Sequence, residues 1–211
     1  TWVKKATINN WTLFSVNNSD IRFSPYSSNG IVEIYAFGSG FFFGFNTDAF
    51  LRDSSAWYHI QLAYDSTQAV ASNRVKIYIN GVQDPASNGF YPNQNGSTDI
   101  NKGGQIHKVG YGSGTGNGNF YLAETAFIDG QALDPTSFGV DKNGVWVPKS
   151  VSGLTFGTNG FYLDFADSAA LGNDVSGNNN DFTSSGLTAS DQMTDTPTNN
   201  FATMNPLWQI N

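Results

Sequence analysis

The chain has 211 residues and a mass of 22.8 kDa, which is long enough for one β-rich domain with a sizeable core. Only 13% of the residues are charged and the net charge is −7, which argues against a nucleic-acid partner because phosphate binding needs clustered Lys and Arg. There are no cysteines, and no stretch approaches the roughly 20 apolar residues of a membrane-spanning helix. The sequence therefore excludes disulfides and thiolate chemistry, and it predicts neither nucleic-acid binding nor membrane insertion.

The first residues lack the apolar run of a signal peptide and the chain starts with Thr1, so we expect a processed piece or an excised fragment. Residues 2–4 predict an early strand. Residues 31–37 and 41–45 predict two more strands around a Gly-Ser-Gly turn. Their many aromatic side chains indicate a sheet that is covered on both faces, or one that keeps a face for a ligand.

Alternation of apolar and polar residues is clearest in two further segments. Residues 57–64 alternate and end at an Asp-Ser turn, and residues 75–80 alternate and end at Asn-Gly, a strong β-hairpin signal. We expect Trp57 to lie in the core.

Helix signals are almost absent. The best is a single turn in which Asp134 caps, Pro135 takes the first helical position and Gly139 closes. Segments 86–104, 110–119 and 184–200 read as loops.

Many short strands with Gly and Asn between them predict an all-β fold, a two-sheet antiparallel β-sandwich. We expect residues 1–183 to form this sandwich, with a late strand at 160–166 completing a sheet. Residues 184–211 are expected to form an Asn- and Pro-rich strap or linker.

Catalysis is not expected. A glycosidase needs two suitably spaced carboxyl groups, and the only glutamates, Glu33 and Glu124, have no acidic residue two or four positions away. The Gly-rich segment at 110–114 contains Gly-Ser-Gly but lacks the helix that follows a nucleophile elbow.

One loop has the composition of a calcium site. Residues 174–181 bring together Asp, Ser and three Asn around a Gly, and calcium binds six to eight such hard oxygens. The candidate ligands are Asp174, Asn178 and Asp181, joined by Glu124 if the strands meet. The alternative is an Asx-rich turn whose side chains bond their own backbone.

The ordered set of segments resembles a laminin-G-like domain of the concanavalin A-like lectin/glucanase superfamily. The resemblance is carried by Trp-Tyr-His-Ile at 57–60, Val-Lys-Ile-Tyr-Ile-Asn-Gly at 75–81, Phe-Tyr-Leu-Ala-Glu at 120–124 and Ile-Asp-Gly-Gln-Ala-Leu at 128–133. It covers about residues 1–139 and implies a jelly-roll sandwich. Because the superfamily often has a strand histidine at this place, it also implies a packed, hydrogen-bonded role for His59.

The order of two elements departs from that superfamily. Its opening strand and its Asp-x-Ser-Gly loop come late here, at 160–165 and 174–181, so the resemblance implies either a circular permutation or a chain cut from an array. Together with Gly-Val-Trp-Val-Pro at 144–148, these segments are also similar to repeats in structural and tail-fibre proteins of marine bacteriophages.

The resemblance and the composition imply a non-catalytic, lectin-like module that binds a glycan in an extracellular setting or at a virion surface. The alternative is a structural virion protein, of a fibre or capsid surface, that acts through protein contacts in a homo-oligomer or larger virion assembly. The candidate sugar-binding residues, on the polar sides of strands or in loops, are Tyr58, Tyr78, Asn80, Tyr111, Asn119 and Tyr121.

Overall fold

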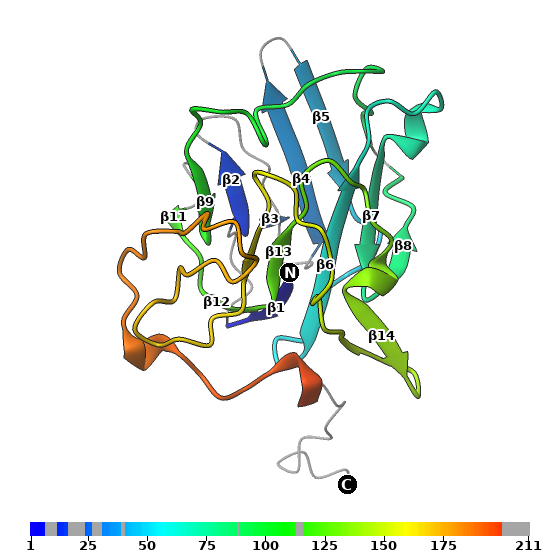
Figure 1. Cartoon of the computed structure of the whole chain (residues 1–211). Coiled ribbons are helices and arrows are strands. Elements are labelled where there is room, and N and C mark those ends of the chain that lie inside the picture. Colours follow the sequence, from blue (N-terminus) through cyan, green and yellow to red (C-terminus); the bar gives the residue numbers. More distant parts are fainter. Residues whose placement is uncertain are drawn as a thin grey trace, which may run out of the picture.

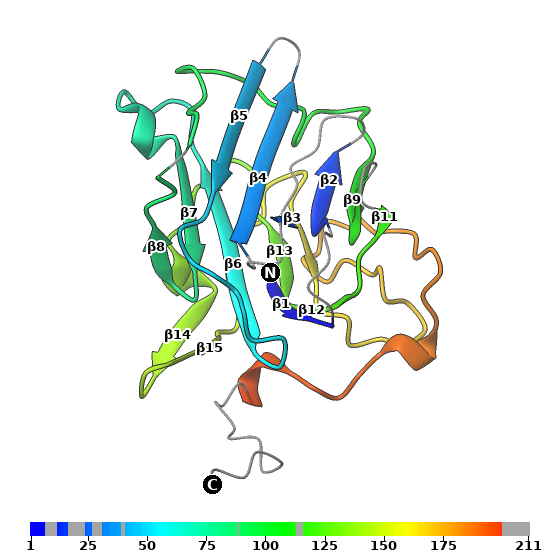
Figure 2. The ribbon, with the colours of Figure 1, turned by 180° about the vertical axis from the view of Figure 1, so that it is seen from behind.

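Two antiparallel sheets pack against each other and form the body of the molecule (Figures 1 and 2). The larger sheet has the strand order β12 (Phe120–Ala123), β1 (Trp2–Lys5), β6 (Trp57–Tyr64), β7 (Val75–Ile79) and β8 (Val82–Asp84). The smaller sheet has the order β3 (Ser24–Tyr26), β4 (Ile31–Gly38) and β5 (Phe41–Asn46). This computed structural model describes residues 1–6, 12–16, 24–26, 31–38, 41–87, 89–112 and 116–199.

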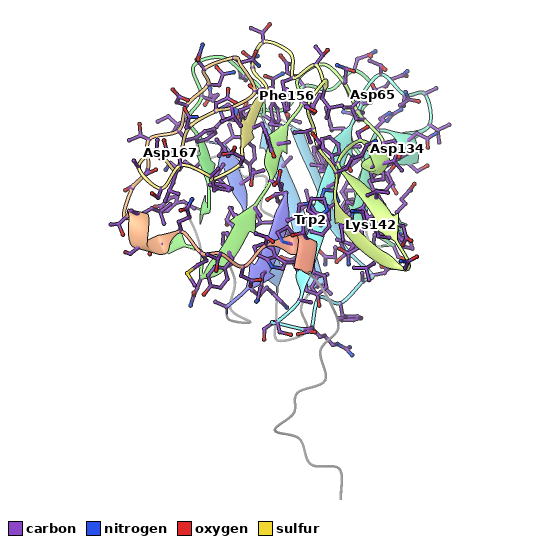
Figure 3. The ribbon with its side chains drawn as sticks, turned by 60° about the horizontal axis from the view of Figure 1, so that its bottom comes forward. Trp2, Asp65, Asp134, Lys142, Phe156 and Asp167 are labelled. Atoms are coloured by element: carbon purple, nitrogen blue, oxygen red, sulfur yellow. The ribbon has the colours of Figure 1, made fainter. Side chains whose placement is uncertain are left out.

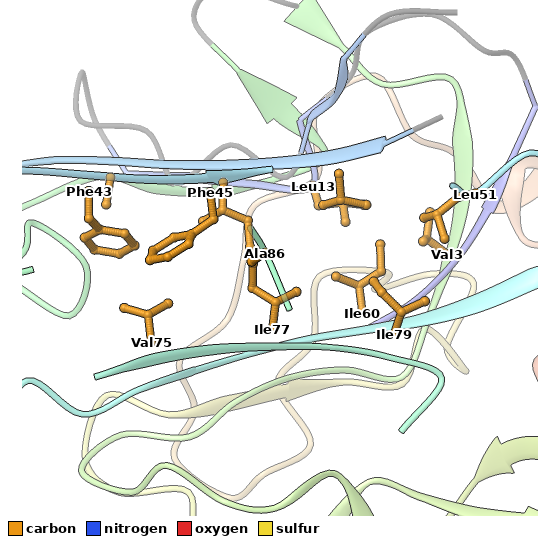
Figure 4. Close-up of a cluster of buried hydrophobic side chains, with 13 residues drawn as sticks. Val3, Leu13, Phe43, Phe45, Leu51, Ile60, Val75, Ile77, Ile79 and Ala86 are labelled. Atoms are coloured by element: carbon orange, nitrogen blue, oxygen red, sulfur yellow. The ribbon is translucent and has the colours of Figure 1, made fainter. Parts of the chain in front are cut away.

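The main core lies between these two sheets (Figure 4). Phe43 and Phe45 point from β5 toward Val75 and Ile77 of β7, and each of these side chains is almost fully buried. They occupy every second position of their strands, because successive side chains of a strand point to opposite faces. Burying one such side chain contributes about 1.5–3 kcal/mol, so this layer supplies much of the stability. The expected all-β sandwich architecture is confirmed, while the jelly-roll order stays a prediction.

The Asn-Gly signal forms the expected hairpin between β7 and β8. Asn80 and Gly81 have φ values of +50° and +79°, the left-handed conformation that two-residue hairpin turns require. The Asn80 side-chain oxygen also accepts a hydrogen bond from the backbone N–H of His59, at 2.8 Å. Asn80 therefore ties the turn to the neighbouring strand β6.

Short pairings complete the molecule around the two sheets. They join β2 (Phe14–Val16) to β9 (His107–Val109), and β10 (Tyr111–Gly112) to β11 (Gly116–Asn117). The segment expected to be one long loop at 110–119 therefore contains a pair of two-residue strands. Segment 86–104 is irregular as expected, apart from one bridge between Phe90 and Gly44.

Residues 124–163 cover the outer face of the larger sheet, the face that points away from the main core. This segment contains β13 (Thr125–Phe127), η2 (Pro135–Ser137), β14 (Gly139–Lys142), β15 (Val145–Pro148) and β16 (Phe161–Leu163). The single helical turn is confirmed as a 3₁₀ turn, because Asp134 caps η2 by accepting from the Thr136 N–H at 3.0 Å. The late strand β16 pairs with β13 of the same chain.

The C-terminal part of the described chain runs along one end of the larger sheet. It contains two 3₁₀ turns, η3 (Ala189–Asp191) and η4 (Pro197–Asn199). A further 3₁₀ turn, η1 (Ala71–Asn73), lies in the loop before β7. Asp195 accepts from Lys4 Nζ at 2.6 Å and from Trp57 Nε1 at 3.4 Å. Asp195 therefore ties this segment to β1 and β6, and residues 200–211 lie outside the described residues (Figure 1).

Within the described residues, no helix is long and apolar enough to cross a membrane.

Candidate ligand-binding site

A cavity of about 930 Å³ lies beside the outer face of β6. Its walls come from β6, from β13 and the residues that follow it up to 133, and from the loop at 97–102. Phe14, Phe127 and Phe161 contribute aromatic surface, with Phe127 and Phe161 stacked at a centroid distance of 5.6 Å. Cavities of this size with apolar walls and a few polar groups are the usual sites of small ligands.

His59 projects from β6 into a group of aromatic rings beside this cavity. The Trp2 ring lies 5.0 Å from the His59 ring, and the Trp146 ring of β15 lies 6.3 Å from it. Figure 3 shows Trp2 close to the middle of the molecule, with the hairpin that carries Lys142 beside it. The packed role expected for His59 is confirmed, and Trp57 is buried as expected.

The hydrogen bond to His59 fixes its chemical form. Trp146 Nε1–H donates to His59 Nδ1 at 3.3 Å, so Nδ1 carries no proton and the ring hydrogen is on Nε2. Burial lowers the pKa of His59 well below its usual 6.5. At neutral pH, His59 is therefore an uncharged hydrogen-bond donor.

Two amide side chains on the cavity wall each have an unused acceptor. Gln61 donates from Nε2 to the Leu133 carbonyl at 2.7 Å, and Asn101 donates from Nδ2 to Asp129. Among the described residues, Gln61 Oε1 and Asn101 Oδ1 have no hydrogen-bond partner although both atoms are buried. A buried acceptor without a partner costs about 1–3 kcal/mol, so a hydrogen-bond donor that reaches either atom would stabilise the site.

The structure does not gather the expected tyrosines into one patch. Tyr121 of β12 and Tyr78 of β7 are three strands apart in the larger sheet, and Tyr111 lies in the separate β10–β11 pair. The prediction that Tyr58 lies on the polar side of its strand is wrong, because its side chain packs against the main core. Alternation could not show this, because β6 is covered on both faces.

The two asparagines expected to bind sugar, Asn80 and Asn119, do not lie together in one site. Asn80 is engaged with His59 at the hairpin, and the Asn119 carbonyl accepts from the Ala6 N–H at 3.2 Å while its side chain is exposed. Among the exposed candidates, Tyr111 makes a cation–π contact, since Lys108 Nζ lies 4.4 Å from the centre of its ring.

The loop at 174–181 is held by its own hydrogen bonds. The Asp174 carboxylate accepts from the backbone N–H of Tyr162, Ser176 and Asn180 and from the Ser176 hydroxyl, at 2.8–2.9 Å. Burial alone would raise the pKa of Asp174, but these hydrogen bonds outweigh it and lower the pKa. These contacts are those of an Asx-rich turn, and the calcium site stays a prediction.

The other expected calcium ligands are also engaged. Asp181 accepts from the Asp174 N–H at 2.8 Å, and Asn178 uses its amide to donate to the Gly157 and Gly160 carbonyls. Glu124 accepts from the Tyr162 hydroxyl. Among the described residues, no group of three or more His, Asp or Glu side chains is placed to hold a metal ion.

Sequence reasoning missed Gln61 and Asn101 as binding candidates. Gln61 and His59 do occupy alternate positions of the strand at 57–64, which was a usable signal. Their neighbours Leu133 and Trp146 are 72 and 87 residues away, so no local pattern indicates what covers this face.

No protein-family model, curated protein or solved structure matches this chain.

Proposed function

We propose that this protein is a non-catalytic, lectin-like module that binds a glycan in the cavity beside β6, in an extracellular setting or at a virion surface. The observation that carries the proposal is the combination of aromatic walls with the neutral polar groups of His59, Gln61 and Asn101. Sugars offer apolar C–H faces and many hydroxyl groups, so they match both kinds of surface. The resemblance to concanavalin A-like and laminin-G-like domains supports the same function.

The carboxylates of the site support a binding role more than a catalytic one. Asp129 accepts from the Asn101 side chain and from the Asn159 N–H at 3.2 Å, and Glu124 is bound by Tyr162. Glycoside hydrolysis requires one carboxyl as acid and a second as base or nucleophile, each free to meet the substrate.

The test is glycan-array screening followed by calorimetry on the variant Gln61→Leu. This change keeps the side-chain volume but removes the amide, and we expect it to weaken binding about tenfold, the effect of about 1.4 kcal/mol. Gln83→Leu on β8 is the matched control, because Gln83 is exposed and lies outside the cavity. Release of reducing ends from any bound glycan would contradict the non-catalytic role, and absence of glycan binding would contradict the function itself.

The structural virion role remains a second candidate because of one exposed edge. Strand β8 ends the larger sheet, and its Val82 is 71% exposed. An open edge with an apolar residue is a place where another chain can pair. Multi-angle light scattering tests this: a defined oligomer that Val82→Lys converts to a monomer supports assembly, and a monomeric wild type argues against it.

A further inference from the structure

The charged side chains that line the cavity affect whether it binds neutral or charged glycans. Its lining contains three carboxylates and two lysines. The carboxylates belong to Asp65, Glu124 and Asp129, and the lysines are Lys102 and Lys149. The balance is therefore slightly negative before any hydrogen bonding is considered.

Both lysines already have partners. Lys102 forms an ion pair with Asp99 at 3.4 Å, and Lys149 donates to the Thr136 carbonyl at 3.0 Å. Lys102 is also largely exposed, so its charge is screened by solvent. Neither ammonium group is held pointing at a ligand by a buried partner.

The remaining basic side chain on the wall, His59, is uncharged. His59 accepts a hydrogen bond from Trp146 on Nδ1, so it presents a neutral ring. An anion that enters the cavity would lose its hydration and meet three carboxylates against two lysines, both of which already have partners, which is unfavourable.

From these contacts we infer that the cavity selects uncharged glycans and rejects anionic ones such as uronates. Among the described residues, its wall offers neutral donors, amide acceptors and three carboxylates, against two lysines that already donate to other groups. This inference rests on the proposed function and deepens it by naming the class of ligand. Specificity of this kind arises from repulsion of the wrong partner as much as from contacts with the right one.

The experiment compares matched pairs of ligands. Neutral oligosaccharides that bind the wild type on an array are oxidised at C6 to the corresponding uronates, and both forms are measured by calorimetry. We expect the uronates to bind at least about tenfold more weakly, because like charges brought close without screening are strongly disfavoured. Uronates that bind as tightly as the neutral forms would overturn the inference and leave the proposed function intact. If neither form of any glycan binds, the proposed function fails and this inference fails with it.

A gain-of-charge variant shows whether charge is the cause. Gln131 lines the cavity and is exposed, so Gln131→Lys adds a cation there with little risk to the fold. We expect this variant to reduce the preference for neutral over oxidised ligands by at least about threefold. Gln83→Lys, outside the cavity, is the control and should leave the preference unchanged. An unchanged preference in Gln131→Lys would contradict the charge explanation.

Discussion

His59 is buried, uncharged and held in one tautomer, and each property has a local cause. The ring is 2% exposed, and Trp146 supplies the hydrogen bond to Nδ1. Trp146 is placed by two glycines, because a Cβ on Gly81 or Gly139 would lie within 2.8 Å of its ring. The resemblance predicts the packed role of His59, whereas the tautomer depends on a residue from a distant hairpin.

The neutral state of His59 predicts how stability depends on pH. The pKa in the folded protein is below the unfolded value of 6.5, so the contribution is complete above pH 6.5 and decreases as pH falls below it. We expect the free energy of unfolding to fall between pH 6.5 and 5.5 by up to about 1.4 kcal/mol per pH unit. Urea denaturation at several pH values measures this.

Two variants separate the histidines in that experiment. His59→Gln should remove most of the pH dependence, while His107→Gln should keep it, because burial lowers the pKa of His107 less strongly. A wild-type stability that stays constant from pH 6.5 to 5.5 would show that His59 accepts a proton freely in the folded state.

Asp174 gives a second test at the scale of one residue. Asp174→Asn replaces one acceptor oxygen by a donor amide facing N–H and O–H groups, so we expect it to cost about 1–3 kcal/mol of stability. Asp167→Asn is the control, because the carboxylate of exposed Asp167 accepts one backbone hydrogen bond, from the Ala169 N–H. Thermal unfolding measures both. The same assay separates the two readings of the loop: a rise of the wild-type midpoint with calcium supports the metal site, and no shift with calcium or EDTA supports the Asx-rich turn.

At the scale of elements, strand β6 shows what the sequence can and cannot predict. Alternation located the strand correctly, and the Asn-Gly pair located the hairpin after β7. Both are local signals, since they depend on neighbouring residues alone. Gln61 of β6 was not assigned to a buried face, because alternation cannot show that a second layer covers the polar side.

The β14–β15 hairpin is the element that builds this second layer beside His59. Gly139→Ala would place a Cβ 2.4 Å from Trp146 Cε2, so we expect the ring to move and the hydrogen bond to His59 to be lost. The expected destabilisation is about 1–3 kcal/mol, as for other overpacked sites. Gly103→Ala is the control, because nothing lies within 4 Å of a Cβ there. If both variants unfold at the same midpoint, Trp146 is not held as described.

At the scale of the whole molecule, the candidate site depends on contacts between distant segments. Phe14 near the start, Phe127 in the middle and Phe161 in the late strand form one aromatic group beside the cavity. The late strand was expected to complete a sheet of the sandwich, and in the structure β16 pairs with β13 in a separate two-stranded sheet. The cavity itself could not be predicted, since it exists only where these segments leave space between them.

The most direct test of the account is an NMR titration of the protein with a neutral oligosaccharide that binds on the array. The account predicts that the largest shifts of backbone amide signals occur at Gln61, Ala126 and Leu133, which line the cavity. Shifts confined to Tyr111 and Tyr121, or no shifts at saturating ligand, would contradict the assignment of this cavity as the binding site.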